Sequence, residues 1–279
     1  MIRFMGSGFL GNALSIFLAT AALADKDEIG PGANLNKHSQ SILVEAEQGI
    51  EWFSREKFYI ARGNAMAIRG RVSVHADTLK ALYRDSLTEK DEIYRLEASG
   101  KVIIRGPDRT AFGDKGIYDL DKSVILVEGK GLKLKTKLDT IKASESLEYW
   151  EKKKIAIARG KATATRGDKT IGANVLTVQF ESGPKDSIRA TRMDAIGGVK
   201  ITTADEIAIG NEGVYDVIGG VVTLTGDVKI TRGKSQLNGS VAEVNLQTGV
   251  SRLVSNKKLE SRQKVRGLFA RETLRKKRD

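Results

Sequence analysis

The feature that most constrains this chain is an internal repeat of 97 residues that needs no gap. Residues 61–83 contain two short strand-like runs on either side of Arg69-Gly70, and residues 158–180 repeat that pattern. The same shift relates Trp52 to Tyr149, Gly63 to Gly160, Ala98 to Ala195, Gly100 to Gly197, Tyr118 to Tyr215 and Gly129 to Gly226. A repeat of this kind indicates an array of similar units that bury their apolar faces against their neighbours.

A shorter spacing lies inside the long repeat and predicts the fold class. Five aromatic residues are 35, 31, 31 and 35 residues apart, namely Tyr83, Tyr118, Tyr149, Phe180 and Tyr215. The chain has 29 Gly and only 3 Pro, with Val, Ile and Thr between the glycines. This composition is typical of many short strands joined by turns. We therefore expect an all-β protein with about a dozen or more short strands in two tandem copies.

Alternating apolar and polar residues predict one apolar and one polar face for the sheet. In residues 96–104, 193–201 and 222–230, apolar residues occupy one face and Lys, Thr or Asp occupy the other. Such period-two alternation favours a mostly antiparallel sheet. No helix is predicted to cover the apolar face, so the sheet must fold on itself as a jelly roll, a sandwich or a solenoid-like roll.

This apolar face is the candidate binding surface. Its residues are Val102, Ile104, Ile125, Val127, Val199, Ile201, Val222, Leu224, Val228 and Ile230. One interpretation is an open apolar trough for a lipid with acyl chains, because each methylene removed from water contributes about 0.8 kcal/mol. The other interpretation is that the same residues form the closed core of a two-layer sandwich.

The N-terminus has the features of a secretion signal. Arg3 precedes an apolar run at residues 13–23, and Ala22-Leu23-Ala24 forms an Ala-x-Ala cleavage site. We expect cleavage after Ala24 and export of the mature protein. The alternative is an uncleaved membrane anchor, for which the apolar run is short.

The expected organisation follows from these segments. A signal peptide at 1–24 and a disordered lead-in at 25–40 precede a first β module at 41–138. A second β module at 139–255 continues the first, and a basic disordered tail at 256–279 ends the chain.

Enzyme motifs, cofactor motifs and metal-ligand clusters are not found in the sequence. Cys is absent, and the two histidines are His38 in the lead-in and His75, whose position in the second copy is Gly172. Asp119 and Asp216 repeat, but each follows a Tyr before a turn, where Asp commonly caps its own backbone. We expect no catalytic residue, no metal and no cofactor.

Basic residues suggest where an anionic partner would bind. The net charge is +12, and Arg69, Arg105, Arg166 and Arg232 recur at or near turn glycines. These arginines are either solvated turn residues or a row of cations for the phosphates of a lipid headgroup. The basic tail does not predict nucleic-acid binding, because the chain is expected to be exported and aromatic residues make up only 6% of it.

Runs such as Ala98-x-Gly100-x-Val102-x-Ile104, Gly-Ile-Tyr-Asp at 116–119 and Val-Ile-Leu-Val-Glu-Gly at 124–129 resemble the LptA/OstA (organic-solvent-tolerance) family. The resemblance covers about residues 41–254 in repeated form. It implies an open, slightly twisted antiparallel β-jelly roll and a role as a periplasmic bridge that binds lipopolysaccharide and carries it to the outer membrane. The strand-rich region is longer than a compact member needs, and the basic tail is an addition.

The partners that the resemblance implies are lipopolysaccharide, an inner-membrane exporter component and an outer-membrane translocon. Unpaired first and last strands would also permit head-to-tail self-association. Two alternatives remain: an exported β-solenoid that binds or cleaves glycans, and a membrane-anchored relative of the same transport system.

Overall fold

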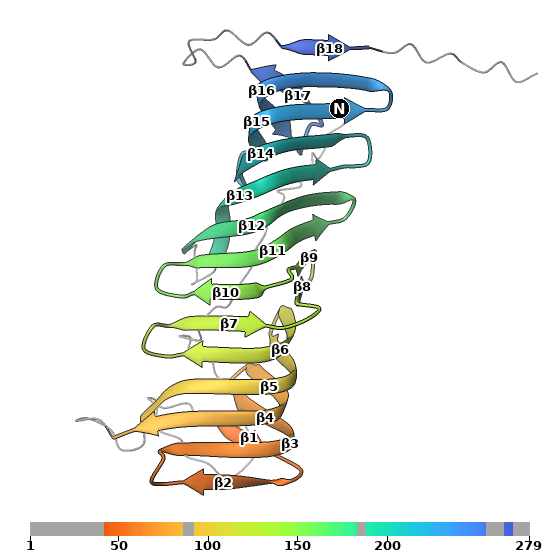
Figure 1. Cartoon of the computed structure of the whole chain (residues 1–279). Coiled ribbons are helices and arrows are strands. Elements are labelled where there is room, and N and C mark those ends of the chain that lie inside the picture. The colour runs from red at the N-terminus through yellow and green to blue at the C-terminus, as the bar shows by residue number, and fades with distance from the viewer. Residues whose placement is uncertain (1–41, 86–91, 183–187, 255–264, 270–279) are drawn as a thin grey trace, which may run out of the picture.

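The computed structural model describes residues 42–85, 92–182, 188–254 and 265–269, and every regular element in these ranges is a β-strand. The strands stack as rungs from β2 at one end to β18 at the other (Figure 1). They are β1 (Leu43–Glu45), β2 (Gly49–Phe53), β3 (Phe58–Arg69), β4 (Val72–Arg84), β5 (Glu92–Gly106), β6 (Arg109–Asp119), β7 (Val124–Glu128), β8 (Lys133–Thr136), β9 (Asp139–Lys142), β10 (Ser146–Trp150), β11 (Ile155–Arg166), β12 (Lys169–Ser182), β13 (Ile188–Thr202), β14 (Ile207–Asp216), β15 (Val221–Arg232), β16 (Ser235–Asn245), β17 (Ser251–Val254) and β18 (Arg266–Leu268).

The strand pairing is antiparallel throughout, and the sheet is continuous from one copy to the next. β7 pairs with β10, and β8 pairs with β9, so strands of both copies are hydrogen-bonded neighbours. The proposed module boundary between 138 and 139 falls in the turn between β8 and β9. The expected fold class is confirmed: the chain is an all-β, repetitive, antiparallel open jelly roll.

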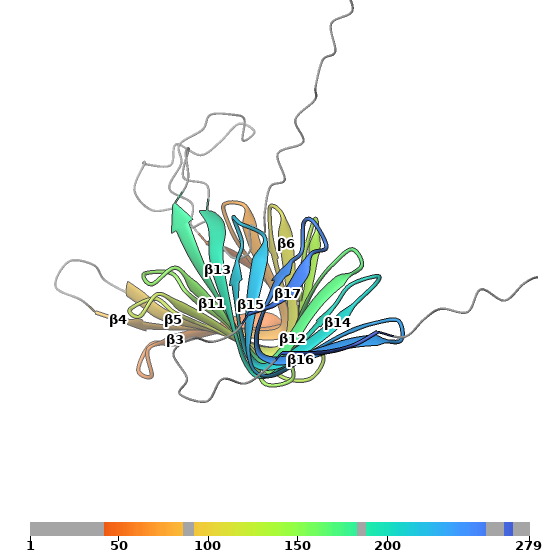
Figure 2. The same ribbon diagram turned by 90° about the horizontal axis from the view of Figure 1, so that it is seen from above.

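The long strands bend near their middle at a pair of residues with positive φ. The pairs are Gly63-Asn64 in β3, Gly100-Lys101 in β5, Gly160-Lys161 in β11, Gly197-Gly198 in β13 and Gly226-Asp227 in β15. The pairing register shifts at each of these pairs, as expected for a β-bulge that sharpens a bend. Viewed along the stack, the bent strands form a V that rotates gradually along its length (Figure 2).

Glycine is required at the bend because a side chain from the preceding strand fills the corner. A Cβ on Gly100 would lie 2.2 Å from Oδ2 of Asp77, and a Cβ on Gly226 would lie 2.5 Å from Nδ2 of Asn211. Gly197 meets Asn174 in the same way. Asp77 and Asn174 are 97 residues apart, so the corner and its filling side chain repeat together.

The bends divide the sheet into two arms, and the core lies between them. We call one the aromatic arm, because it contains Tyr83, Tyr118, Tyr149, Phe180 and Tyr215, and the other the arginine arm, because it contains Arg69, Arg105, Arg166 and Arg232. The main core cluster runs from Ala111 to Val244 and takes residues from both arms. A small second cluster contains only Ala76, Ala98 and Val102.

Most residues of the two terminal segments lie outside the described ranges. The expected signal peptide at 1–24 and lead-in at 25–40 lie outside the described residues, as does most of the tail at 256–279. Within that tail, which was expected to be disordered, residues 266–268 form β18 and pair with β16. The tail has few apolar residues, but Gly267 packs on Leu237, and Val265 lies beside Gly239. The described part of the chain contains no helix long and apolar enough to cross a membrane.

We predict that Gly100→Ala lowers the free energy of unfolding by about 1–3 kcal/mol, because Ala disfavours a φ of +80° and its methyl group overlaps Asp77. Urea unfolding followed by circular dichroism measures the loss. Gly106→Ala is the matched control in the same strand: the nearest atom to its Cβ is 3.5 Å away, and its φ is ordinary. Equal losses in the two variants would contradict the assigned role of the corner.

Candidate functional site

The predicted trough residues lie on the inner faces of the two arms. In β15, Val222 and Leu224 belong to the aromatic arm, and Val228 and Ile230 belong to the arginine arm. All ten predicted residues except Ile104 are buried, and Ile104 is half-buried. Nine of the ten belong to the main core cluster or pack against it, and Val102 belongs to the small one. The structure therefore brings the predicted surface together, with the second copy packed as a core.

The space left between the arms in the second copy is small. An apolar hollow of about 20 Å³ lies there, lined by residues that include Ile141 and Ala164 of the arginine arm and Leu147, Leu176 and Met193 of the aromatic arm. This volume is close to that of one water molecule.

The inner face of the first copy is more exposed than that of the second. Four matched pairs of residues, each 97 apart, are half-buried in the first copy and buried in the second: Val74 and Ile171, Leu79 and Leu176, Leu96 and Met193, and Ile104 and Ile201. Ile201 is only 1% exposed. Because the registers match, the difference arises from what covers these residues and not from the strand pattern.

Two of the four predicted rim arginines are engaged in ion pairs. Arg166 forms two 2.7 Å hydrogen bonds to the carboxylate of Asp139, which is buried. Arg232 donates to Glu206 at 2.9 Å and to the carbonyl of Gly249 at 3.0 Å. Arg69 and Arg105 are exposed and form no ion pair with another described residue. The arginines available to an anionic ligand are therefore in the first copy.

Polar contacts in the second copy connect the turns of the arginine arm to those of the aromatic arm. We call the line along which these turns face one another the mouth. Lys169 Nζ donates to the carbonyl of Leu246 at 2.6 Å. Ser251 Oγ donates to Glu206 Oε1 at 2.5 Å, while the other carboxylate oxygen of Glu206 accepts from Arg232. We call Lys169, Glu206, Arg232 and Ser251 the clasp.

Where the arginine arm of the first copy faces Tyr118, Tyr149 and Glu151, the mouth has a different set of polar groups. The Tyr118 hydroxyl lies 3.3 Å from a carboxylate oxygen of Glu151, and burial raises the pKa of Tyr118 to about 12. Burial also raises the pKa of Glu151, while the charge of Arg69 across the mouth acts in the opposite direction. Arg109 is half-buried near Tyr149, and burial lowers its pKa. These groups interact across the mouth, but no hydrogen bond or ion pair between described residues closes it there.

The clasp leaves a signal in the sequence as a mismatch between residues that are 97 positions apart. Position 109 is Arg in the first copy, and position 206, which is 97 residues later, is Glu. Lys169 likewise corresponds to Val72. A change of charge or polarity between otherwise matching repeats marks a position where the copies differ in their contacts. Lys169, Glu206 and Ser251 were missed because they lie in or beside turns.

The end of the first copy carries an aromatic cluster on its inner face. Trp52 stacks on Tyr59 with ring centroids 5.6 Å apart, and Trp52 Nε1 donates to the Tyr83 hydroxyl at 2.6 Å. Tyr83 is buried, whereas Trp52 is 62% exposed. The cluster lies on the aromatic arm at the end of the stack that β2 forms.

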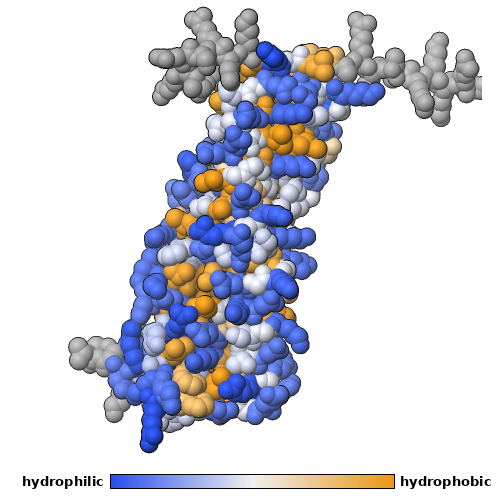
Figure 3. Space-filling model, viewed as in Figure 1, coloured by the Kyte–Doolittle hydropathy of each residue, from blue (hydrophilic) through white to orange (hydrophobic). Residues whose placement is uncertain are grey.

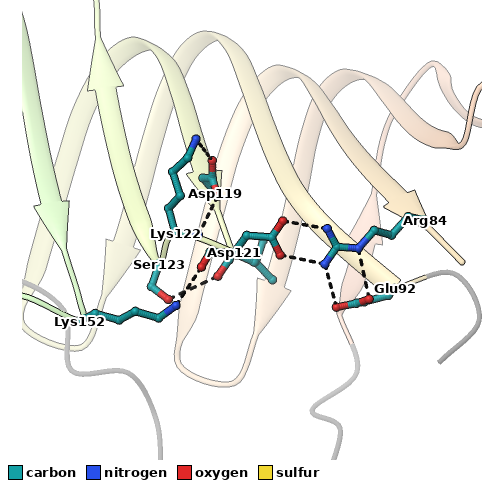
Figure 4. A network of polar contacts seen from close by, with 8 residues as sticks. Arg84, Glu92, Asp119, Asp121, Lys122, Ser123 and Lys152 are labelled. Carbon is teal, nitrogen blue, oxygen red and sulfur yellow. Dashed lines mark hydrogen bonds and ion pairs between the residues drawn. The ribbon is translucent and has the colours of Figure 1, made fainter. Parts of the chain in front are cut away.

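The outer side of the roll is mostly polar. In the view of Figure 3 its surface is largely hydrophilic, and the hydrophobic residues form separate patches. At the rim of the aromatic arm, Arg84 forms bonds of 2.8 and 2.9 Å to Asp121 and also contacts Glu92, and Lys152 donates to the carbonyl of Asp121 (Figure 4). This network ties β4 and β5 to the turns before β7 and β11.

The two repeated aspartates have the structural role expected of them. Asp119 Oδ1 accepts from the backbone N–H of Lys122, and Asp216 Oδ1 accepts from the N–H groups of Ile218 and Gly219. Within the described residues no three His, Asp or Glu side chains are grouped as metal ligands would be.

Parts of the chain are similar to known proteins. Residues 140–250 match the model of the LptA/(LptD N-terminal domain) LPS transport protein family. An uncharacterized protein of Rhizobium meliloti (strain 1021) is 27% identical over 117 residues, which is 40% of this chain and 62% of that protein. The match thus spans less than two thirds of the relative. LptH, the LptA homologous periplasmic component of the lipopolysaccharide transport device of Pseudomonas aeruginosa, is similar over 48% of this chain and 95% of its own, with 15% identity and a TM-score of 0.41.

The fold defines the chain as an open antiparallel β-jelly roll with an apolar inner face. Residues 140–250 are similar to the LptA/(LptD N-terminal domain) family, which confirms the LptA/OstA-like resemblance found in the sequence. The matching family is one of transport proteins and not of enzymes.

We predict that Arg166→Gln lowers the free energy of unfolding by about 3 kcal/mol, because it leaves the buried Asp139 carboxylate without its cation. Arg69→Gln, at the matching position of the first copy, should change it by less than about 0.5 kcal/mol. Paired chemical denaturation curves measure both values. A small effect of Arg166→Gln would show that this arginine is available to a ligand, as the sequence analysis proposed.

Proposed function

We propose that this protein is a periplasmic lipopolysaccharide-binding bridge that carries lipopolysaccharide from the inner to the outer membrane. The observation that carries the proposal is the apolar inner face, which follows the whole stack of strands and is only half-buried at Val74, Leu79, Leu96 and Ile104 of the first copy. The match of residues 140–250 to a lipopolysaccharide transport family supports it.

The chemistry of the inner face suits acyl chains. The predicted residues are all aliphatic, so they gain from covering methylenes, at about 0.8 kcal/mol for each. They also place no charged group in the path of a chain. Because similar residues recur at every rung, a chain that moves by one rung meets a nearly equivalent surface. Binding along such a surface is compatible with transport.

The rim of the first copy suits an anionic headgroup. Arg69 and Arg105 are exposed and form no ion pair with another described residue, whereas Arg166 and Arg232 are neutralised by Asp139 and Glu206. We therefore keep Arg69 and Arg105 as candidates for the lipid phosphates, to which arginine can donate two hydrogen bonds at once. We no longer propose Arg166 and Arg232 for that role.

The ends of the roll suit partners of the same architecture. Among the described residues β2 pairs only with β3, whereas β10, its counterpart in the second copy, pairs with both β7 and β11. At the other end, β17 and β18 pair only with β16 in the described part of the chain. Unpaired edges of this kind accept a further strand. We propose that they bind the exporter component, the translocon or another copy of this chain.

We predict that a photo-crosslinking residue at Leu79 or Leu96 captures lipopolysaccharide in cells, because both side chains are half-buried on the inner face of the first copy. The same residue at Lys80 or Glu97, which point to the opposite face of the same strands, is the control. Immunoblotting of the purified protein for lipopolysaccharide reads the result. Capture at the control positions alone, or at none of the four, would contradict the proposed cargo.

We predict that the protein associates end to end as its concentration rises, and that Ile50→Lys weakens this association. Ile50 lies in the edge strand β2 and is exposed, and an added charge there opposes strand addition. Sedimentation velocity over a wide concentration series measures it. Ile218→Lys changes an equally exposed residue in a turn away from both edges and is the control. Identical behaviour of the two variants would argue against association through β2.

A further inference from the structure

The two copies differ in charge at the mouth, where Arg109 of the first copy corresponds to Glu206 of the second. Glu206 in the second copy accepts hydrogen bonds from Arg232 of the arginine arm and from Ser251 of the aromatic arm. The first copy has Arg109 at the matching position. A guanidinium has no acceptor atom, so Arg109 cannot hold a hydroxyl and a second arginine in this way. The central acceptor of the clasp is therefore absent from the first copy.

The second contact of the clasp also lacks a counterpart. Lys169 reaches the carbonyl of Leu246 across the mouth, but the matching residue of the first copy is Val72, which has no side-chain donor. In place of hydrogen bonds between described residues across the mouth, the charges of Arg69 and Arg109 of the first copy face Tyr118, Tyr149 and Glu151, the last two of which lie at the start of the second copy. Those phenols and that carboxylate face the mouth on its aromatic side.

The burial of several inner-face residues also differs between the copy with the clasp and the copy without it. The four matched pairs described above are half-buried where the clasp is absent and buried where it is present. The order in which the two arms face each other also leaves inner-face residues of the first copy more exposed. Turns of the arginine arm contact aromatic-arm residues well further along the chain, as Lys169 contacts Leu246. An aromatic-arm strand therefore needs an arginine-arm strand from earlier in the chain to face it. For β2 to β4 no such earlier strand is described.

We propose that the roll has a lateral opening for the acyl chains of an amphipathic anionic lipid in its first copy, and that the clasp keeps the second copy closed to lateral access. This inference rests on the proposed function for the identity of the lipid, but the opening itself is a property of the roll. Acyl chains enter between the arms beside Val74 and Ile104, with Arg69 and Arg105 at the rim to meet the anionic headgroup. In the second copy chains move only along the roll, after the arms separate.

Thiol labelling tests the opening without any lipid, because the chain has no cysteine of its own. Single cysteines replace Val74 and Ile104 in the first copy, and Ile171 and Ile201 at the matching positions of the second. We expect a bulky maleimide to label the first pair at least about tenfold faster than the second, which corresponds to about 1.4 kcal/mol of additional opening free energy. Equal labelling rates in the two copies would overturn the proposal.

A charge reversal tests the clasp. Glu206→Arg places the residue of the first copy in the second and sets it against Arg232, so it should raise labelling at Ile171→Cys and Ile201→Cys several-fold without changing Val74→Cys. Glu243→Arg is the matched control, because Glu243 pairs with Arg252 away from the inner face of the same sheet. A thermal melt by circular dichroism establishes that each variant is folded. If Glu206→Arg leaves the second copy unlabelled, or both reversals act alike, the clasp has no such role.

Photo-crosslinking with purified lipopolysaccharide then separates this inference from the proposed function. We expect capture at Leu79 and not at its counterpart Leu176 in the wild-type background, and capture at both in the Glu206→Arg background. Asymmetric thiol labelling with no capture at either position would leave the lateral opening standing and overturn lipopolysaccharide as the cargo. Equal capture at Leu79 and Leu176 in the wild-type background would overturn the assignment of lateral access to the first copy.

Discussion

The packing of a corner side chain against a positive-φ glycine is the constraint on which the rest of this structure depends. Asp77 over Gly100 and Asn174 over Gly197 leave no room for a Cβ, and the residue after each glycine also has a positive φ. The strand therefore bends there and continues in the other arm. Without these bends the antiparallel sheet would be open and flat, and its apolar face would have nothing to cover it.

The bends also determine where the apolar surface is buried. Each long strand supplies inner residues to both arms, as β15 does with Leu224 before its bend and Val228 after it. The arms bury most of this surface in the second copy, where polar bonds from Lys169 and Glu206 connect the turns. In the first copy the arms have the same strand pattern but lack these bonds. Matching sequences therefore give two different degrees of closure.

This difference connects the two interpretations that the sequence left open. A closed core and an open trough were alternatives for the same apolar residues, and nine of the ten predicted residues are buried while Ile104 is half-buried. Val199 and Ile201 lie in a packed core, while Ile104 and Leu79 lie on a half-exposed face. The rim arginines show the same division, because Arg166 is bound to Asp139 and Arg69 forms no ion pair with another described residue. Under our proposal, a lipid with acyl chains and an anionic headgroup binds where both features occur together.

The sequence by itself determined the repeat, the all-β class, the antiparallel pairing and the set of inward-facing residues, because each depends on local spacing. Alternation by two separates Val228 and Ile230 from Lys229, and the aromatic spacing marks the ends of the rungs. The resemblance to the LptA/OstA family was also visible in short motifs such as residues 98–104. Only the tertiary structure decided which inner residues are covered and which arginines are paired. Those properties depend on contacts across the mouth between residues far apart in the chain, such as Lys169 with Leu246 and Glu206 with Ser251, and no local pattern encodes them.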